Sequence, residues 1–269
     1  MKFALVEGER REAKHGLSGK CPLYGHAMIA KCGEHRVHHW AHRANCTCDH
    51  WWEPESEWHR AWKNQFPPEW QEIIQRSEDG EKHIADVKTK SGVVLEFQHS
   101  FLRRDERESR EMFYSNMVWV VNGLRRVRDR SGFFESLARA SICKAKPLTY
   151  SLRLNKCPLL REWVGSPKPV FFDFGDNSEP DDPQSFPAPV LWRLEPRSPK
   201  GEAHLSPVLK TAFLDKYLKG SSLKGIDYSV ELIELRAVYA ALLQQAPRPQ
   251  PLIGFQRYLA RQERARRRF

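Results

Sequence analysis

Three polar residues in the middle of the chain interrupt two short apolar segments. Asp86 lies within residues 83–89, and Glu96 and Gln98 lie within residues 93–98. Alternate side chains of a strand share a face, so Glu96 and Gln98 lie on one face and the opposite face is wholly apolar. Carboxylates enclosed by apolar strands are costly unless they are paired or bind a cation. The pattern therefore indicates a site at which Asp86 and Glu96 together hold Mg²⁺ or Mn²⁺ through carboxylate oxygens.

Such a cation suits the cleavage of a phosphodiester bond. It polarises the phosphate, helps to generate hydroxide and neutralises the charge that develops on the leaving oxygen. Glu57, on a predicted helix before the strands, could complete the metal shell or orient the attacking water. The alternative is that Glu96 occupies the exposed face of an edge strand and Asp86 caps a turn, in which case neither binds a cation.

Hydrophobic periodicity predicts the elements that position these residues. In chain order they are a helix at 55–66, strands at 70–75, 83–89 and 93–98, a helix at 103–114, a strand at 117–122 and a helix at 131–140. This order predicts an α+β core in which helices flank a mixed sheet. Further on, we expect strands at 170–174 and 190–194, a Pro- and Asp-rich loop between them, and helices at 206–218, 230–244 and 255–268.

A basic stripe runs along the predicted helix at 103–114. Arg103, Arg107, Arg110 and Tyr114 recur at intervals that place them on one helical face. One interpretation is contact with phosphates beside the cleavage site, with Tyr114 stacking or closing the site. The other is a solvated face paired with neighbouring glutamates. More arginines stand in a predicted loop where a nucleic-acid backbone could bind; they are Arg125, Arg126, Arg128 and Arg130.

Motifs of this central region resemble a known group of nucleases. Asp86 followed by Glu96-Phe97-Gln98 is similar to the pattern of the PD-(D/E)xK nuclease superfamily. Further segments, in order, resemble the competence protein CoiA-like nucleases; they are Glu57–Lys63, His83–Val87, Leu95–Ser100 and Glu106-Arg107 through Phe113-Tyr114. The similarity covers roughly Cys21 to Asn122.

The resemblance implies a restriction-endonuclease-like core, dependence on Mg²⁺, and single- or double-stranded DNA as substrate. In that family Gln commonly stands where the superfamily has Lys, so Gln98 does not indicate a lost activity. A glutamine cannot supply the charge of a lysine, and Lys63 or Lys88 could restore it. His59 and Lys63, one turn apart, could contact the scissile phosphate, although His59 could equally be structural. The resemblance also favours a phosphate contact for Arg107.

Cysteine and histidine residues concentrate near the start of the chain. A structural zinc ion takes four such ligands and stabilises a segment too small to have its own core. Residues 1–50 resemble the zinc-binding part of the same family, in which a Cys-Pro-x-Cys pair precedes a His-Phe-Ala-His stretch. This sequence departs from that pattern because Tyr24 stands at the second cysteine.

The expected zinc ligands come from both halves of this motif. They are Cys21, Cys32, His39 and His42, and His26 could replace Cys32 as the fourth ligand. If zinc is not bound, these residues are surface histidines and buried free cysteines. A second set of candidate ligands comprises Cys46, Cys48 and His50.

The composition of the chain indicates what kind of partner it binds and where in the cell it is expected. The chain has 269 residues, a formal net charge of +10 and a pI of about 9.4, which favours a polyanionic partner. No apolar run approaches the roughly 18 residues of a transmembrane helix, and the sequence turns polar too soon for a secretory signal. We therefore expect a cytoplasmic protein. The basic segment Phe255–Phe269 could clamp DNA, bind a partner protein or lie on a membrane surface.

The sequence divides into three predicted regions. Residues 1–50 are a Cys/His-rich, zinc-finger-like segment, residues 51–165 a nuclease-like core, and residues 166–269 an α/β to largely helical region with a basic tail. The predicted activity is metal-dependent hydrolysis of DNA in uptake, recombination or defence. Two alternatives are a ribonuclease with the same fold, since phosphodiester chemistry does not distinguish the sugars, and a nucleic-acid-binding protein without catalysis.

Overall fold

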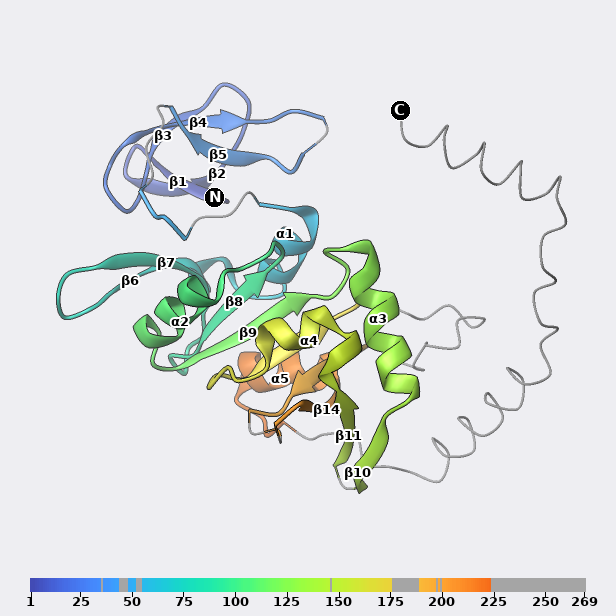
Figure 1. Cartoon of the computed structure of the whole chain (residues 1–269). Coiled ribbons are helices and arrows are strands. Elements are labelled where there is room, and N and C mark those ends of the chain that lie inside the picture. The colour runs from blue at the N-terminus through green and yellow to red at the C-terminus, as the bar shows by residue number, and fades with distance from the viewer. Residues whose placement is uncertain are drawn as a thin grey trace, which may run out of the picture. The chain divides into compact units, whose positions relative to one another are not determined.

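The computed structural model describes residues 1–34, 36–43, 48–51, 55–145, 147–175, 189–196, 198 and 200–223 (Figure 1). All described residues belong to one compact unit, Met1–Asp227. The helices predicted at 230–244 and 255–268 therefore lie outside the described residues, as does most of the loop predicted between 175 and 189.

A five-stranded antiparallel sheet begins the first unit, in the order β2-β1-β3-β4-β5. Its strands are β1 (Phe3–Val6), β2 (Glu9–Glu12), β3 (Ser18–Lys20), β4 (Ala27–Lys31) and β5 (His39–His42). Trp40 is fully buried in its core, and the indole N–H donates to the carbonyl of Arg11 at 2.8 Å. Gly19 lies against this ring, because a Cβ there would be 3.2 Å from Trp40.

The rest of the unit is built on a nine-stranded mixed sheet in the order β10-β11-β14-β13-β12-β9-β8-β7-β6. Its strands are β6 (Gln71–Arg76), β7 (Lys82–Lys88), β8 (Val94–Gln98), β9 (Met117–Asn122), β10 (Ser141–Ala145), β11 (Leu148–Arg153), β12 (Val170–Asp173), β13 (Val190–Leu194) and β14 (Glu202–Leu209). β9 pairs in parallel with both β8 and β12, and the other pairs are antiparallel. The predicted mixed sheet is confirmed.

The helices described are α1 (Glu57–Lys63), α2 (Arg104–Phe113), α3 (Val127–Ala138), α4 (Pro158–Trp163) and α5 (Lys210–Lys219). On one face of the large sheet, Trp62 of α1 stacks on Phe97 of β8 with ring centroids 5.5 Å apart, and Phe213 of α5 lies 5.7 Å from Trp62. On the opposite face, Trp163 of α4 packs 5.2 Å from Trp119 of β9. Helices therefore flank both faces, as the sequence predicted.

The five-stranded sheet lies on the side of the large sheet where β6, β7 and β8 run (Figure 1). The backbone N–H groups of Lys2 and Phe3 donate to the carboxylate of Glu72 on β6 at 2.6 and 2.9 Å. This join is buried, and it holds Glu72 at a positive φ of 47°. A side chain rather than a shared strand therefore connects the two sheets at this point.

The structure corrects the sequence analysis beyond residue 165. The large sheet continues through β12, β13 and β14, so the predicted division between residues 165 and 166 falls inside it. The helix predicted at 206–218 is wrong at its start, because Ser206 to Leu209 belong to β14 and α5 begins at Lys210. No helix in the described part of the chain is long and apolar enough to cross a membrane.

Candidate functional site

Asp86 and Glu96 meet where the backbone pairing of β7 and β8 ends. The antiparallel ladder stops at Val87 and Leu95. One step further, side chains take over: the Asp86 N–H donates to Glu96 Oε1 at 3.3 Å, and the Phe97 N–H donates to Asp86 Oδ2 at 2.9 Å. The two carboxylates thus occupy the end of the ladder on the same face of the sheet, as the alternation of residues predicted.

A cavity of about 440 Å³ contains these residues. Asp86, Glu96 and Gln98 line it from the large sheet, while Met28 and Trp40 line it from the five-stranded sheet. The charged and hydroxyl-bearing residues around the acidic pair are Asp49, Glu55, His59, Lys63, Glu72, Arg110 and Tyr114. The N-terminal sheet is therefore one wall of the candidate site.

The two carboxylates of the pair have opposite electrostatic surroundings. Burial would raise the pKa of Asp86, but His59 and Lys63 outweigh burial and hold this pKa below its ordinary value. The pKa of Glu96 is raised well above its ordinary value by burial and by the charge of Asp86, and Arg110 only partly compensates. Consistent with this, 18% of the Asp86 side chain is exposed and only 7% of the Glu96 side chain.

His59 reaches the acidic pair from α1. Ser56 caps this helix by accepting a hydrogen bond from the His59 backbone N–H at 3.2 Å, which fixes the first turn. His59 Nε2 lies 2.8 Å from Asp86 Oδ2. Among the described residues, nothing hydrogen-bonds to the buried Nδ1 of His59. A buried ring nitrogen normally has a partner, so Nδ1 is available to a water molecule or a ligand.

Lys63, one turn further along α1, is held between two buried carboxylates. Its Nζ lies 2.7 Å from Glu55 Oε1 and 2.7 Å from Glu72 Oε1. Burial would lower the pKa of Lys63, but the charges of Glu72 and Glu55 outweigh burial and raise the pKa above its ordinary value. Lys63 therefore stays protonated, and it cannot serve as a general base.

Arg110 and Tyr114 of the predicted stripe also line the cavity. Arg110 lies 3.5 Å from Glu96 Oε2 and donates to the carbonyl of Trp51 at 2.7 Å. Burial raises the pKa of Tyr114 far above its usual range, so the residue is a neutral phenol. Its buried hydroxyl has no hydrogen-bond partner within the described chain.

The other two members of the stripe lie outside the cavity. Arg103 is exposed and pairs with Asp105. Arg107 is buried; it donates to the carbonyl of Glu162 at 2.5 Å and lies over the ring of Trp163. The charge of Arg107 is thus taken up inside the fold rather than on a surface, contrary to the predicted phosphate contact.

Gln98, Glu57 and Lys88 differ in how they relate to the site. Gln98 lines the cavity, and its Nε2 donates to the carbonyl of Ser100 at 3.2 Å. Glu57 is exposed on the first turn of α1 and does not line the cavity; Glu55, two residues earlier, does. Lys88 donates to Gln75 at 2.7 Å on β6 and lies outside the cavity as well.

The second predicted basic run is divided between interior and helix. The guanidinium of Arg125 is buried and bonds to the carbonyl of Ser100 at 2.9 Å and to Glu162. Arg128 and Arg130 lie in α3 rather than in a loop. The sequence patterns of these arginines could not reveal their non-local partners.

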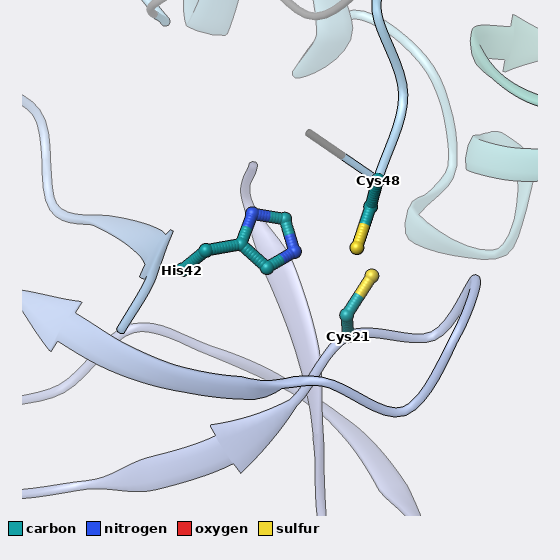
Figure 2. Close-up of side chains that lie close together, drawn as sticks. All are labelled: Cys21, His42 and Cys48. Carbon is teal, nitrogen blue, oxygen red and sulfur yellow. The ribbon is translucent and has the colours of Figure 1, made fainter. Parts of the chain in front are cut away.

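Cys21, His42 and Cys48 form a compact group of metal-ligating side chains, and their ligand atoms all lie within 4.8 Å of one another. Figure 2 shows the two sulfur atoms beside the imidazole of His42, which projects from the end of β5. The Cys21 carbonyl accepts from Gly25 N–H and the Cys21 N–H donates to His26 O, both at 2.8 Å, which closes a tight loop. This loop brings His26 Nδ1 to 2.9 Å from Cys48 Sγ.

The predicted zinc ligands Cys32 and His39 do not belong to this group. His39 and His42 are three residues apart on β5, so their side chains lie on opposite faces of the strand. Lys31 pairs with His39 and Met28 with His42, so Cys32 follows the end of β4 that is distant from His42. Cys46 of the second predicted set lies outside the described residues.

Sequence reasoning missed three participants of these sites, namely Asp49, Glu55 and Glu72, and it did not group Cys48 with Cys21. Glu55 and Glu72 had a weak signal, because Glu55 begins the predicted helix at 55–66 and Glu72 interrupts the predicted strand at 70–75. Glu72 contacts the backbone of Lys2, which is far away in the sequence, and both glutamates contact Lys63, whose partners the sequence does not indicate.

Comparison of the chain with protein-family models, with curated proteins and with solved structures finds no match. The resemblance to CoiA-like nucleases therefore stays a prediction from the sequence motifs.

Proposed function

We propose that this protein is a metal-dependent nuclease whose cation is held by Asp86 and Glu96. The observation that carries the proposal is the pair of carboxylates at the end of the β7–β8 ladder, inside a cavity. Arg110, 3.5 Å from Glu96, does not offset burial and the charge of Asp86, so the pKa of Glu96 stays raised, and a bound cation would supply the missing positive charge.

The charges around the pair fit a divalent cation. Lys63 is neutralised by Glu55 and Glu72, so its charge is already balanced. Both described hydrogen bonds to the Asp86 carboxylate end on Oδ2, and no described residue donates to Oδ1. Carboxylate oxygens are the ligands that Mg²⁺ and Mn²⁺ prefer, so Asp86 and Glu96 would hold the ion. When bound, the ion would polarise the phosphate and activate a water molecule.

The remaining residues of the cavity act on position and charge. His59 orients Asp86 through the 2.8 Å contact; because the carboxylate accepts from Nε2, the Nδ1 of a neutral ring can accept a hydrogen bond from a water molecule. Arg110 keeps positive charge near a phosphate, and Gln98 offers an amide where the superfamily pattern has a lysine. The hydroxyl of Tyr114 can donate a hydrogen bond to a phosphate oxygen.

The proposed substrate is DNA. The net charge of +10 supports a polyanionic ligand, because neutralised phosphates release counterions and so strengthen binding. This charge does not distinguish DNA from RNA, and the preference for DNA rests on the motif resemblance alone.

Cleavage of single-stranded DNA, double-stranded DNA and RNA in the presence of Mg²⁺ or Mn²⁺ tests the proposal. We expect wild-type protein to cut DNA only with metal, and Asp86→Ala and Glu96→Ala to lose cutting. Glu57→Gln is the matched control, because this exposed carboxylate lies outside the cavity and its loss should leave the rate unchanged. Cutting of RNA alone would reassign the substrate, and no cutting of any substrate would contradict the proposal.

We also propose that zinc binds at Cys21, His26, His42 and Cys48. This set replaces the predicted one and has the two-sulfur, two-nitrogen composition of structural zinc sites. The loop that carries Cys21 and His26, the end of β5 and the segment with Cys48 would then be joined in a region of short strands. The role inferred is structural, since four protein ligands leave no open position for a reactant.

A further inference from the structure

A second group of metal-ligating side chains shares no ligand with either site described above. A ring nitrogen of His50, a carboxylate oxygen of Glu81 and a ring nitrogen of His83 all lie within 4.8 Å of one another. His50 follows the segment that carries Cys48, Glu81 ends the turn between β6 and β7, and His83 lies on β7. Residues far apart in the chain therefore present three donor atoms at one point.

Asp49 determines which nitrogen of His83 faces this point. Asp49 Oδ1 lies 2.9 Å from His83 Nδ1, and both oxygens of Asp49 are fixed by backbone N–H groups, of Trp51 at Oδ1 and of Ile84 at Oδ2, each at 3.0 Å. A carboxylate can only accept, so Nδ1 must carry the proton. In a neutral His83, Nε2 is then a lone-pair donor. A carboxylate that orients a histidine in this way is the usual outer partner of a metal-binding imidazole.

His83 Nε2 faces a second acceptor, Glu81 Oε1, at 3.0 Å. Two lone pairs at this distance repel each other unless a cation lies between them or the imidazole takes up a second proton. Metal bonds of about 2.0–2.1 Å to nitrogen and oxygen place neighbouring ligand atoms about 3.4 Å apart in a tetrahedral site, so small side-chain rotations would suffice. A proton shared between His83 and Glu81 would need no third donor. The presence of His50 at the same point therefore favours a metal ion.

The frame around the buried ligand is rigid. His83 is 1% exposed, with Trp51 stacked on its ring and Phe113 against its edge. The ring of His50 packs at 5.2 Å against that of His83, and both His50 and Glu81 are exposed. One anchored ligand with two ligands at the surface makes a site that is open to metal from solution.

We propose that His50, Glu81 and His83 bind a divalent transition-metal ion of the zinc class, with Asp49 as the residue that orients His83. Two imidazoles and one carboxylate favour such an ion over Mg²⁺, which prefers oxygen ligands only. The bound ion joins the segment of residues 48–51 to the β6–β7 hairpin, whose second strand carries Asp86. It is separate from the Cys21–Cys48 group because the two groups share no residue, and it contains no sulfur ligand.

Titration of metal-free protein with Co²⁺, in excess Mg²⁺ to occupy oxygen-only sites, tests the proposal by counting bound ions rather than by cleavage. We expect wild type to bind one more equivalent of Co²⁺ than His50→Ala or Glu81→Gln. The equivalent that is lost should lack the thiolate-to-cobalt charge-transfer band. Both substitutions are at exposed positions, and Glu78→Gln in the same turn and His15→Ala are matched controls that should bind as wild type does.

Equal Co²⁺ binding by wild type, His50→Ala and Glu81→Gln would overturn the proposal. Loss of the same equivalent in Glu78→Gln would also overturn it, because the effect would be one of general surface charge. Neither result depends on whether the protein cleaves nucleic acid.

Discussion

At the scale of single residues, Asp86 and Glu96 could be found from sequence because their signal is local. A carboxylate between apolar neighbours on a strand is visible in a short window, and its face follows from alternation. The partners of Lys63 were not visible in this way. Glu72 comes to Lys63 only because the chain turns at residues 64–70 and adopts a positive φ at Glu72. Pairing of this kind depends on the tertiary fold.

Gln98 decides whether the site needs a charged residue at this position. We expect Gln98→Lys to retain cleavage and Gln98→Leu to lose it by at least about tenfold, the equivalent of one hydrogen bond worth about 1.4 kcal/mol. Single-turnover cleavage rates measure both variants. A fully active Gln98→Leu protein would remove Gln98 from the mechanism.

The lowered pKa of Glu55 predicts how the stability of the folded protein depends on pH. Burial would raise its pKa, but the hydrogen bond from Arg60 and the charge of Lys63 outweigh burial and hold the pKa well below its ordinary value of 4.5. The unfolded chain therefore takes up this proton first as pH falls, so the stabilisation is present above pH 4.5 and is lost progressively below it.

Urea unfolding at several pH values measures this contribution. Glu55→Gln should lower the free energy of unfolding by about 3 kcal/mol at pH 7, because Lys63 and Arg60 lose a buried partner, and the gap to wild type should narrow below pH 4.5. Glu57→Gln, at an exposed position on the same helix, should change it by less than about 0.5 kcal/mol. A pH-independent gap for Glu55→Gln would contradict the assignment.

At the scale of elements, segments with a clear hydrophobic pattern were predicted from the sequence, and segments without such a pattern were not. The strand at 190–194 was predicted with its observed ends, whereas β2 exposes all four of its residues and offers no alternation to detect. Ser206-Pro207 resembles a helix start, with a capping serine followed by proline. Pro207 instead pairs with Trp192 on β13, and the ladder with β11 ends at Leu205, so the missing N–H of Pro207 costs no hydrogen bond there.

His39 and His42 lie on opposite faces of β5, and only His42 belongs to the group of metal-ligating side chains. We expect His42→Ala and Cys48→Ser each to lower the zinc content of dialysed protein by about one equivalent relative to wild type. His39→Ala and Cys32→Ser should leave zinc content unchanged, since neither belongs to the group. Metal analysis by mass spectrometry decides between these sets. Zinc loss in His39→Ala but not in His42→Ala would restore the ligands predicted from sequence.

At the scale of the whole described unit, the join between the two sheets shapes the candidate site. The five-stranded sheet forms a wall of the cavity, and Glu72 accepts hydrogen bonds from the backbone of Lys2 and Phe3, where β1 begins. The sequence divided the chain near residue 50, whereas the last strand of this sheet ends at His42, and nothing in the sequence indicated that the two parts share a site.

Glu72→Ala should loosen this join. Removing both acceptor oxygens leaves two buried N–H groups and Lys63 with fewer partners, so peptides from residues 1–12 should exchange hydrogen for deuterium at least about tenfold faster. Glu69→Ala, at an exposed position nearby, is the control and should exchange as wild type does. Unchanged exchange in Glu72→Ala would show that other contacts hold the sheets together.

The central claim is that Asp86 and Glu96 together bind a divalent cation. Binding of Mn²⁺, followed by electron paramagnetic resonance, tests it most directly, with the isosteric variants Asp86→Asn and Glu96→Gln compared to wild type. We predict one Mn²⁺ site in wild type that is weakened by at least about tenfold in each variant and retained in Glu57→Gln. Equal Mn²⁺ binding by wild type, Asp86→Asn and Glu96→Gln would contradict the account.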